Sequence, residues 1–116
     1  MSLSLEEKTQ LCSQVAQDKK ARDLVILDLR KYSYVTDYFM ICSGSSTVQV
    51  QAIADAIDDR LEQEGIRPIG REGYSEARWI LLDYSDLVVH IFYDETRRFY
   101  DLDRLWGDAS TIEVSG

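Results

Sequence analysis

The sequence WILLDYSDLVVHIFY, which occupies Trp79–Tyr93, consists of two apolar runs separated by the polar turn Tyr84-Ser85-Asp86. Turn residues between β-rich runs predict a β-hairpin, with Trp79–Asp83 paired to Leu87–Tyr93. Alternation along the first strand separates its side chains into two sets: Trp79, Leu81 and Asp83 on one face, and Ile80, Leu82 and Tyr84 on the other. Both sets contain large apolar residues, so both faces of this strand need a cover.

The segments around the hairpin predict three helical regions and three further strands. A capping box at Ser4–Glu7 begins a helix that runs to Asp18, and an apolar stripe predicts a second helix between the turn Ser43–Ser46 and the stop at Gly65. Asp94–Trp106 indicates one or two short helical turns, with Phe99, Leu102, Leu105 and Trp106 packing inward. The remaining strands are expected at Leu24–Leu29, Tyr38–Cys42 and Ile66–Ile69.

This order of elements predicts a single α+β domain with a mixed sheet of about five strands and flanking helices. We expect the domain to span residues 4–109, followed by a flexible C-terminal tail at 110–116. The helix after Tyr38–Cys42 is expected to form a right-handed crossover to a parallel neighbour of that strand.

The chain is acidic, with 13 basic and 21 acidic residues among 116 and a net charge of −8. This balance disfavours direct binding of nucleic acid or of a membrane surface, and it favours the approach of a basic partner. Neither a membrane-spanning run nor a targeting signal is evident, so we expect a cytoplasmic protein. Cys12 and Cys42 lie within apolar patterns and are expected to be buried thiols.

Three groups of residues were considered for catalysis or metal binding. The turn Ser43-Gly44-Ser45-Ser46 could hold a phosphate, but no Asp-x-Asp pair follows it, so we favour its interpretation as a helix N-cap and tight turn. His90 has no assignable nucleophile, which favours a structural or interface role. Asp83 and Asp86 fit turn chemistry. We therefore expect no catalytic, cofactor-binding or metal-binding residue.

The face of the first hairpin strand that carries Trp79 has two interpretations. A helix of the same chain covers it, or it is an exposed apolar patch rimmed by Glu72, Glu76, Asp83 and Asp86, which is the anatomy of a protein-docking site. Trp79 suits such a site, because tryptophan removes a large apolar area from water at low entropic cost.

Five segments together resemble the Iojap-related family of ribosome silencing factors. The resemblance extends from the first helix to Ala109, and its most characteristic segments are Thr36–Gly44, Glu72-Gly73, Trp79–Tyr84, Asp86–Phe92 and Arg98–Trp106. It implies a nucleotidyltransferase-like fold that lacks the metal-binding carboxylates of those enzymes, and hence a protein that is not an enzyme.

The resemblance also implies a partner and a site. The partner is the large ribosomal subunit, which the family binds through the basic ribosomal protein fourteen. This protein lies on the face that the small subunit must approach, so the bound factor blocks joining of the subunits and represses translation under nutrient limitation. The resemblance implies a homodimer when the protein is free. The expected partner-binding residues are Trp79, Leu81, Asp83, Tyr84, His90, Glu72 and Glu76. Two alternatives stay open: a nucleotidyltransferase-like enzyme, and an assembly factor of the large subunit that contacts ribosomal RNA.

Overall fold

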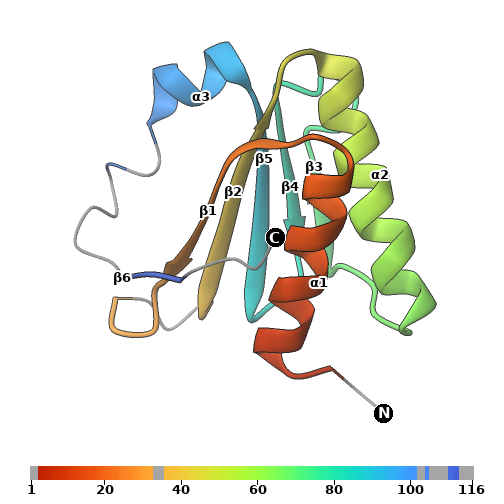
Figure 1. Ribbon diagram of the computed structural model, residues 1–116, viewed down its shortest axis with the longest axis vertical. Helices are drawn as coiled ribbons and strands as arrows, with labels where there is room; N and C mark the ends of the chain where they lie inside the picture. Colours follow the sequence, from red (N-terminus) through yellow and green to blue (C-terminus); the bar gives the residue numbers. More distant parts are fainter. Residues whose placement is uncertain (1–2, 33–35, 102–103, 105–109, 113–116) are drawn as a thin grey trace.

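The computed structural model describes residues 3–32, 36–101, 104 and 110–112, which form one mixed sheet with two helices on one side and a third on the other (Figure 1). The sheet has six strands in the order β3-β4-β5-β2-β1-β6. In chain order the elements are α1 (Leu5–Asp18), β1 (Arg22–Asp28), β2 (Tyr38–Gly44), α2 (Thr47–Gln63), β3 (Gly70–Glu72), β4 (Trp79–Asp83), β5 (Leu87–Tyr93), α3 (Asp94–Tyr100) and β6 (Ser110–Thr111). The predicted α+β domain with a mixed sheet is confirmed.

The hairpin predicted from Trp79–Tyr93 is present as β4 and β5, and it determines the topology. β5 pairs in parallel with β2, with Phe39 opposite Val88, whereas every other pair of neighbouring strands is antiparallel. The predicted crossover from β2 to an adjacent parallel strand is wrong. α2 leads instead to β3 at the sheet edge, because the long strand β5 occupies the position next to β2.

The helix ends follow the signals in the sequence. Ser4 Oγ accepts a hydrogen bond from the Glu7 amide at 3.1 Å, and Glu7 Oε1 accepts from the Ser4 amide at 2.9 Å, which completes a capping box. Ser46 caps α2 by accepting from the Gln49 amide at 3.1 Å. Gly65, with a φ of +76°, follows the end of α2 in the left-handed conformation.

The two edge strands of the sheet differ from the prediction. Ile66–Ile69 is not a strand, because Pro68 has no amide hydrogen to donate; pairing begins at the Ile69 amide, which donates to the Asp83 carbonyl at 2.7 Å. At the other edge, β6 pairs with β1, and the Ile112 amide donates to the Ile26 carbonyl at 3.0 Å. The folded domain therefore extends past the predicted boundary at Ala109.

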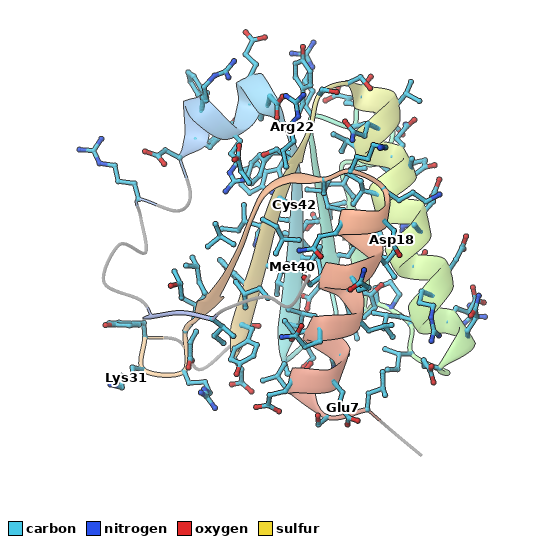
Figure 2. All side chains as sticks on the ribbon, in the orientation of Figure 1. Glu7, Asp18, Arg22, Lys31, Met40 and Cys42 are labelled. Atoms are coloured by element: carbon cyan, nitrogen blue, oxygen red, sulfur yellow. The ribbon has the colours of Figure 1, made fainter. Side chains whose placement is uncertain are left out.

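The two faces of the sheet are covered unequally. The face toward α1 and α2 carries the main hydrophobic core, in which Met40 and Cys42 of β2 lie on the side that faces α1 (Figure 2). A smaller cluster lies on the opposite face: Leu27, Leu29, Ile41 and Phe92, with Val25, Phe39 and Trp79 packed against it. No helix within the described residues is long and apolar enough to cross a membrane.

The third helix covers little of that opposite face. α3 is short and contains no buried residue. Phe99, which was expected to pack inward, is 82% exposed, because α3 turns Tyr100 toward the sheet instead, with its ring 5.1 Å from that of Trp79. The other residues expected to pack inward, Leu102, Leu105 and Trp106, lie outside the described residues.

The substitution Gly73→Ala should lower the free energy of unfolding by about 2–5 kcal/mol. Gly73 has a φ of +79°, and a Cβ there would lie 2.1 Å from the carbonyl oxygen of Trp79. Gly65→Ala is the matched control, because Gly65 has a φ of +76° but no atom within 4 Å of the added Cβ. We expect the control to lose only about 1–2 kcal/mol, the cost of a left-handed backbone. Equal losses in urea denaturation would contradict the close approach at Gly73.

Candidate functional site

The sheet face turned away from α1 and α2 is hereafter called the open face. Cross-strand register and side-chain alternation assign eight residues of β2, β4 and β5 to it: Phe39, Ile41, Trp79, Leu81, Asp83, Val88, His90 and Phe92. Phe39, Trp79 and Leu81 remain partly exposed, whereas Ile41 and Phe92 are fully buried. The open face is therefore an apolar surface with a packed floor and accessible anchors.

The indole of Trp79 is held in a fixed orientation. Its Nε1 donates a hydrogen bond to His90 Nδ1 at 3.1 Å, and its ring stacks on that of Phe92 with 4.9 Å between the centroids. The ring of Phe39 meets that of His90 edge-on at 4.4 Å. Trp79 is thus a preordered side chain, which loses little entropy when a partner covers it.

His90 is buried at the centre of this aromatic group, with 4% of its surface exposed. Because Nδ1 accepts from Trp79, the neutral imidazole carries its hydrogen on Nε2, and this atom has no hydrogen-bond partner in the described part of the chain. Burial lowers the pKa of His90 to about 4. A neutral histidine that accepts from an indole orients that indole and activates no nucleophile, which fits a structural or interface role.

Five of the seven predicted partner-binding residues lie together. Trp79, Leu81 and Asp83 follow one another along the open face of β4, and His90 is opposite Leu81 on β5. Glu72 is opposite Leu81 on the edge strand β3, so its exposed carboxylate flanks the same row. Asp83 Oδ1 accepts from the Ser85 amide at 2.8 Å, so this carboxylate also stabilises the hairpin turn.

Tyr84 does not belong to this group, and its expected position beside Trp79 is corrected. It lies in the core on the helix-covered face with only 5% of its surface exposed, where burial raises the pKa of its hydroxyl. The reason is the alternation along β4: Tyr84 is five residues from Trp79, an odd number, and so continues the face of Ile80 and Leu82.

Glu76, the seventh predicted residue, lies outside the open face, in the loop that precedes β4. It is exposed in the loop 73–78 and lines a groove between this loop and α3, with a volume of about 670 Å³. Trp79 forms part of the groove wall, so the groove continues the open face. Tyr100 and the exposed Phe99 complete the wall and were not among the predicted site residues. Both residues directly follow Arg98, in a segment that carries part of the family resemblance, and this position was the signal that could have assigned them to the site.

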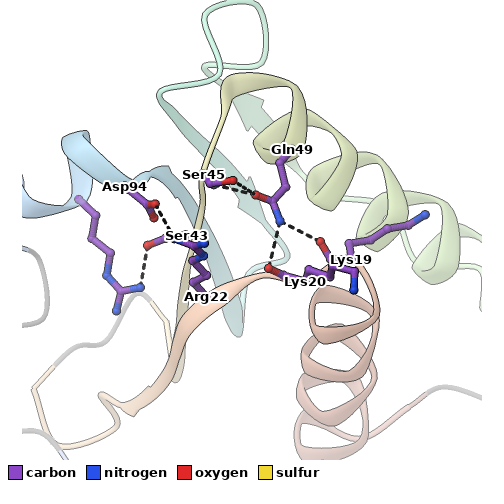
Figure 3. Close-up of polar contacts among 8 residues, drawn as sticks. Lys19, Lys20, Arg22, Ser43, Ser45, Gln49 and Asp94 are labelled. Atoms are coloured by element: carbon purple, nitrogen blue, oxygen red, sulfur yellow. Dashed lines mark hydrogen bonds and ion pairs between the residues drawn. The ribbon is translucent and has the colours of Figure 1, made fainter.

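The small-residue turn between β2 and α2 is filled by the chain itself (Figure 3). Gln49 Oε1 accepts from the Ser45 amide at 2.7 Å, and Gln49 Nε2 donates to the carbonyls of Lys19 and Lys20 at 3.1 and 3.0 Å. Arg97 Nη1 donates to Ser43 Oγ at 2.9 Å. The amides of Ser45 and Gln49 are thus bonded to side chains of the turn, and the geometry is that of a helix cap and tight turn.

The other residues that were candidates for chemistry, two cysteines and Asp86, make contacts that stabilise the fold. Cys12 and Cys42 are buried free thiols, as predicted, and burial raises the pKa of each to about 12. Asp86 forms an ion pair with Lys8 of α1. In the part of the chain that the structure describes, no three His, Cys, Asp or Glu side chains are grouped so that they could hold a metal ion.

The NMR signals of the His90 ring should titrate near pH 4. The unfolded chain has the ordinary pKa of about 6.5, so between pH 6.5 and 4 it binds more protons than the folded protein does. The stability that neutral His90 contributes is therefore complete above pH 6.5 and is lost as the pH falls toward 4, about 3 kcal/mol in all. His90 is the only histidine, so its signals are unambiguous. A midpoint near 6.5 would contradict its burial.

Comparisons with known proteins identify the family of the chain. The family model "Ribosomal silencing factor during starvation" matches residues 2–116. The chain is 46% identical over 104 residues to the Ribosomal silencing factor RsfS of Bacillus subtilis, covering 90% of this chain and 88% of that relative. It is 43% identical over 114 residues to RsfS of Halalkalibacterium halodurans, covering 98% and 97%.

The fold is shared as well as the sequence. A crystal structure from Bacillus halodurans matches with a TM-score of 0.84 at 40% identity, over 94% of this chain and 99% of that one. The family model covers almost every residue of the chain. The chain therefore belongs to the family of ribosomal silencing factors.

Proposed function

We propose that this chain binds the large ribosomal subunit in the cytoplasm through its open face, and that it contacts the basic large-subunit ribosomal protein fourteen there. The bound chain keeps the small subunit from joining and so represses translation when nutrients are short. The observation that carries the proposal is the unequal covering of the sheet: α1 and α2 bury one face, whereas Trp79, Leu81 and Phe39 remain accessible on the other.

The chemistry of the open face supports a basic protein as the partner. Its accessible centre is apolar, and the carboxylates of Glu72, Asp83 and Glu76 lie at its edges. An apolar centre with a charged rim is the usual anatomy of a protein interface. The net charge of −8 adds a long-range attraction for a positively charged surface, which speeds association at low salt.

Silencing of this kind needs binding alone and no catalytic group. The molecule extends over 34 × 34 × 27 Å. Contacts between ribosomal subunits require their surfaces to approach to about 4 Å. A folded body of this size, fixed on the surface where the subunits meet, excludes that approach sterically.

The same surface also suits self-association. We propose that free chains form a homodimer through the open face, which would remove the accessible apolar side chains from water when no ribosome is present. Binding to the large subunit would then compete with dimerisation, because both would use the open face.

The substitution Leu81→Lys should weaken binding to isolated large subunits by at least about tenfold, the effect expected for a charge placed in the apolar centre of an interface. Val48→Lys is the matched control: Val48 lies on α2, is 73% exposed, and gives the same change in net charge. Co-sedimentation through a sucrose cushion measures the bound fraction. Equal binding by both variants would show that the open face is not the docking surface. Absence of binding by the unaltered chain would contradict the proposed function.

The unaltered chain should also lower the yield of joined ribosomes. When it is added to purified large subunits before small subunits, we expect fewer joined particles on a sucrose gradient, because its site lies where the small subunit must approach. Leu81→Lys should restore joining, and Val48→Lys should not. Undiminished joining with the chain bound to every large subunit would contradict steric exclusion.

A further inference from the structure

The loop 73–78, between β3 and β4, connects the open face to the helix on the other side of the sheet. On one side it lines the groove beside Trp79, through Gly73, Glu76 and Arg78. On the other side it is bonded to α2 through Tyr74. We propose that Tyr74 is a positioning residue for the docking surface: through its hydrogen bond to Asp55 of α2, it holds the loop where Glu76 and Trp79 can meet the ribosomal partner. This inference rests on the proposed function.

The contacts of Tyr74 join the loop to α2 at several points. Tyr74 Oη donates to Asp55 Oδ2 at 2.9 Å, and Gln51 Nε2 donates to the Tyr74 carbonyl, also at 2.9 Å. The guanidinium of Arg71 lies 4.9 Å from the centre of the Tyr74 ring and pairs with Asp58 at 2.9 Å. Both the backbone and the side chain of Tyr74 are therefore tied to one rigid helix.

The conformation of the loop requires such support. Gly73 and Ala77 have φ angles of +79° and +56°, and the left-handed conformation is unfavourable for alanine. A single hydrogen bond within the loop, from the Ala77 amide to the Gly73 carbonyl at 2.9 Å, closes it. A backbone of this kind persists only when surrounding contacts hold it. Here those contacts come from α2 at Tyr74 and from β5 at the end of the loop, where the Tyr93 amide donates to the Arg78 carbonyl at 2.9 Å.

Displacement of the loop would reach Trp79 directly. Trp79 follows the buried Ala77 by two residues, and the backbone of Gly73 lies so close to the Trp79 carbonyl that no Cβ fits between them. A loosened loop would have to be ordered again when the partner binds, and this ordering would reduce affinity. Contacts on the helix-covered side of the sheet thus determine the geometry at the edge of the open face.

The test compares three substitutions in the Tyr74–Asp55 pair. Tyr74→Phe removes the donor and Asp55→Ala removes the acceptor, so each should weaken binding to large subunits by about threefold to tenfold. Asp55→Asn keeps an oxygen that accepts from Tyr74 and should bind nearly as the unaltered chain does. The double variant Tyr74→Phe/Asp55→Ala should be no weaker than Asp55→Ala alone, because both substitutions remove the same hydrogen bond, and Asp55→Ala also removes the 3.9 Å ion pair with Arg71.

Arg67→Gln is the control, since it breaks the exposed Arg67–Glu62 ion pair near the far end of α2. Hydrogen exchange of the Ala77 amide reports loop order separately and should accelerate in Tyr74→Phe but not in Arg67→Gln. If Leu81→Lys weakens binding while Tyr74→Phe changes neither binding nor exchange, the positioning role is overturned and the proposed function stands. If the unaltered chain does not bind large subunits, both are overturned.

Discussion

The packing of α1 and α2 against a single face of the sheet is the constraint on which the rest of the structure depends. Both helices place apolar stripes on that face, and the ion pair from Lys8 of α1 to Asp86 fastens the hairpin turn to the helical layer. The carbonyl of Asp86 also accepts from the amides of Asp37 and Tyr38, where β2 begins. The opposite face is left to α3, which has no buried residue. Burial of the apolar side chains on this opposite face by another molecule would therefore be favourable, because it removes them from water.

The hydrogen bond between Trp79 and His90 makes that face suitable for docking. A tryptophan covered by a partner must not leave its indole N–H without an acceptor, because an unpaired buried donor is costly. His90 supplies the acceptor within the monomer, so a partner does not need to provide an acceptor for the indole. An imidazole can do this only while neutral, and the burial that lowers its pKa to about 4 keeps it neutral under ordinary conditions. The stability of this face and its suitability for the proposed docking therefore depend on the same contact.

Much of the fold was predictable, because its signals are local. The hairpin, both helix caps and the left-handed stop at Gly65 follow from a few neighbouring residues each. Errors arose where the outcome depended on distant contacts: the separation of β3 from β2 within the sheet, the pairing of β6 with β1, and the exposure of Phe99. Tyr84 is a different case, because strand alternation already assigns it to the other face of β4 from Trp79. The role of Tyr74 was not predictable, because its partner Asp55 lies on a separate element.

The turn between β2 and α2 has a structural role, because its polar groups are bonded to other parts of the chain. A small-residue turn at the start of a helix offers free amides to an anion only if no side chain of the protein takes them first. Here the side-chain amide of Gln49 connects the turn to the end of α1. Its oxygen accepts from the Ser45 amide, and its nitrogen donates to the two carbonyls that follow α1. The same residue thus closes the turn and joins the two helices, so opening the turn to a phosphate would also loosen the helical layer. The hydrogen bonds of this turn therefore stabilise the covered face, whereas the accessible apolar side chains of β2 and β4 lie on the open face.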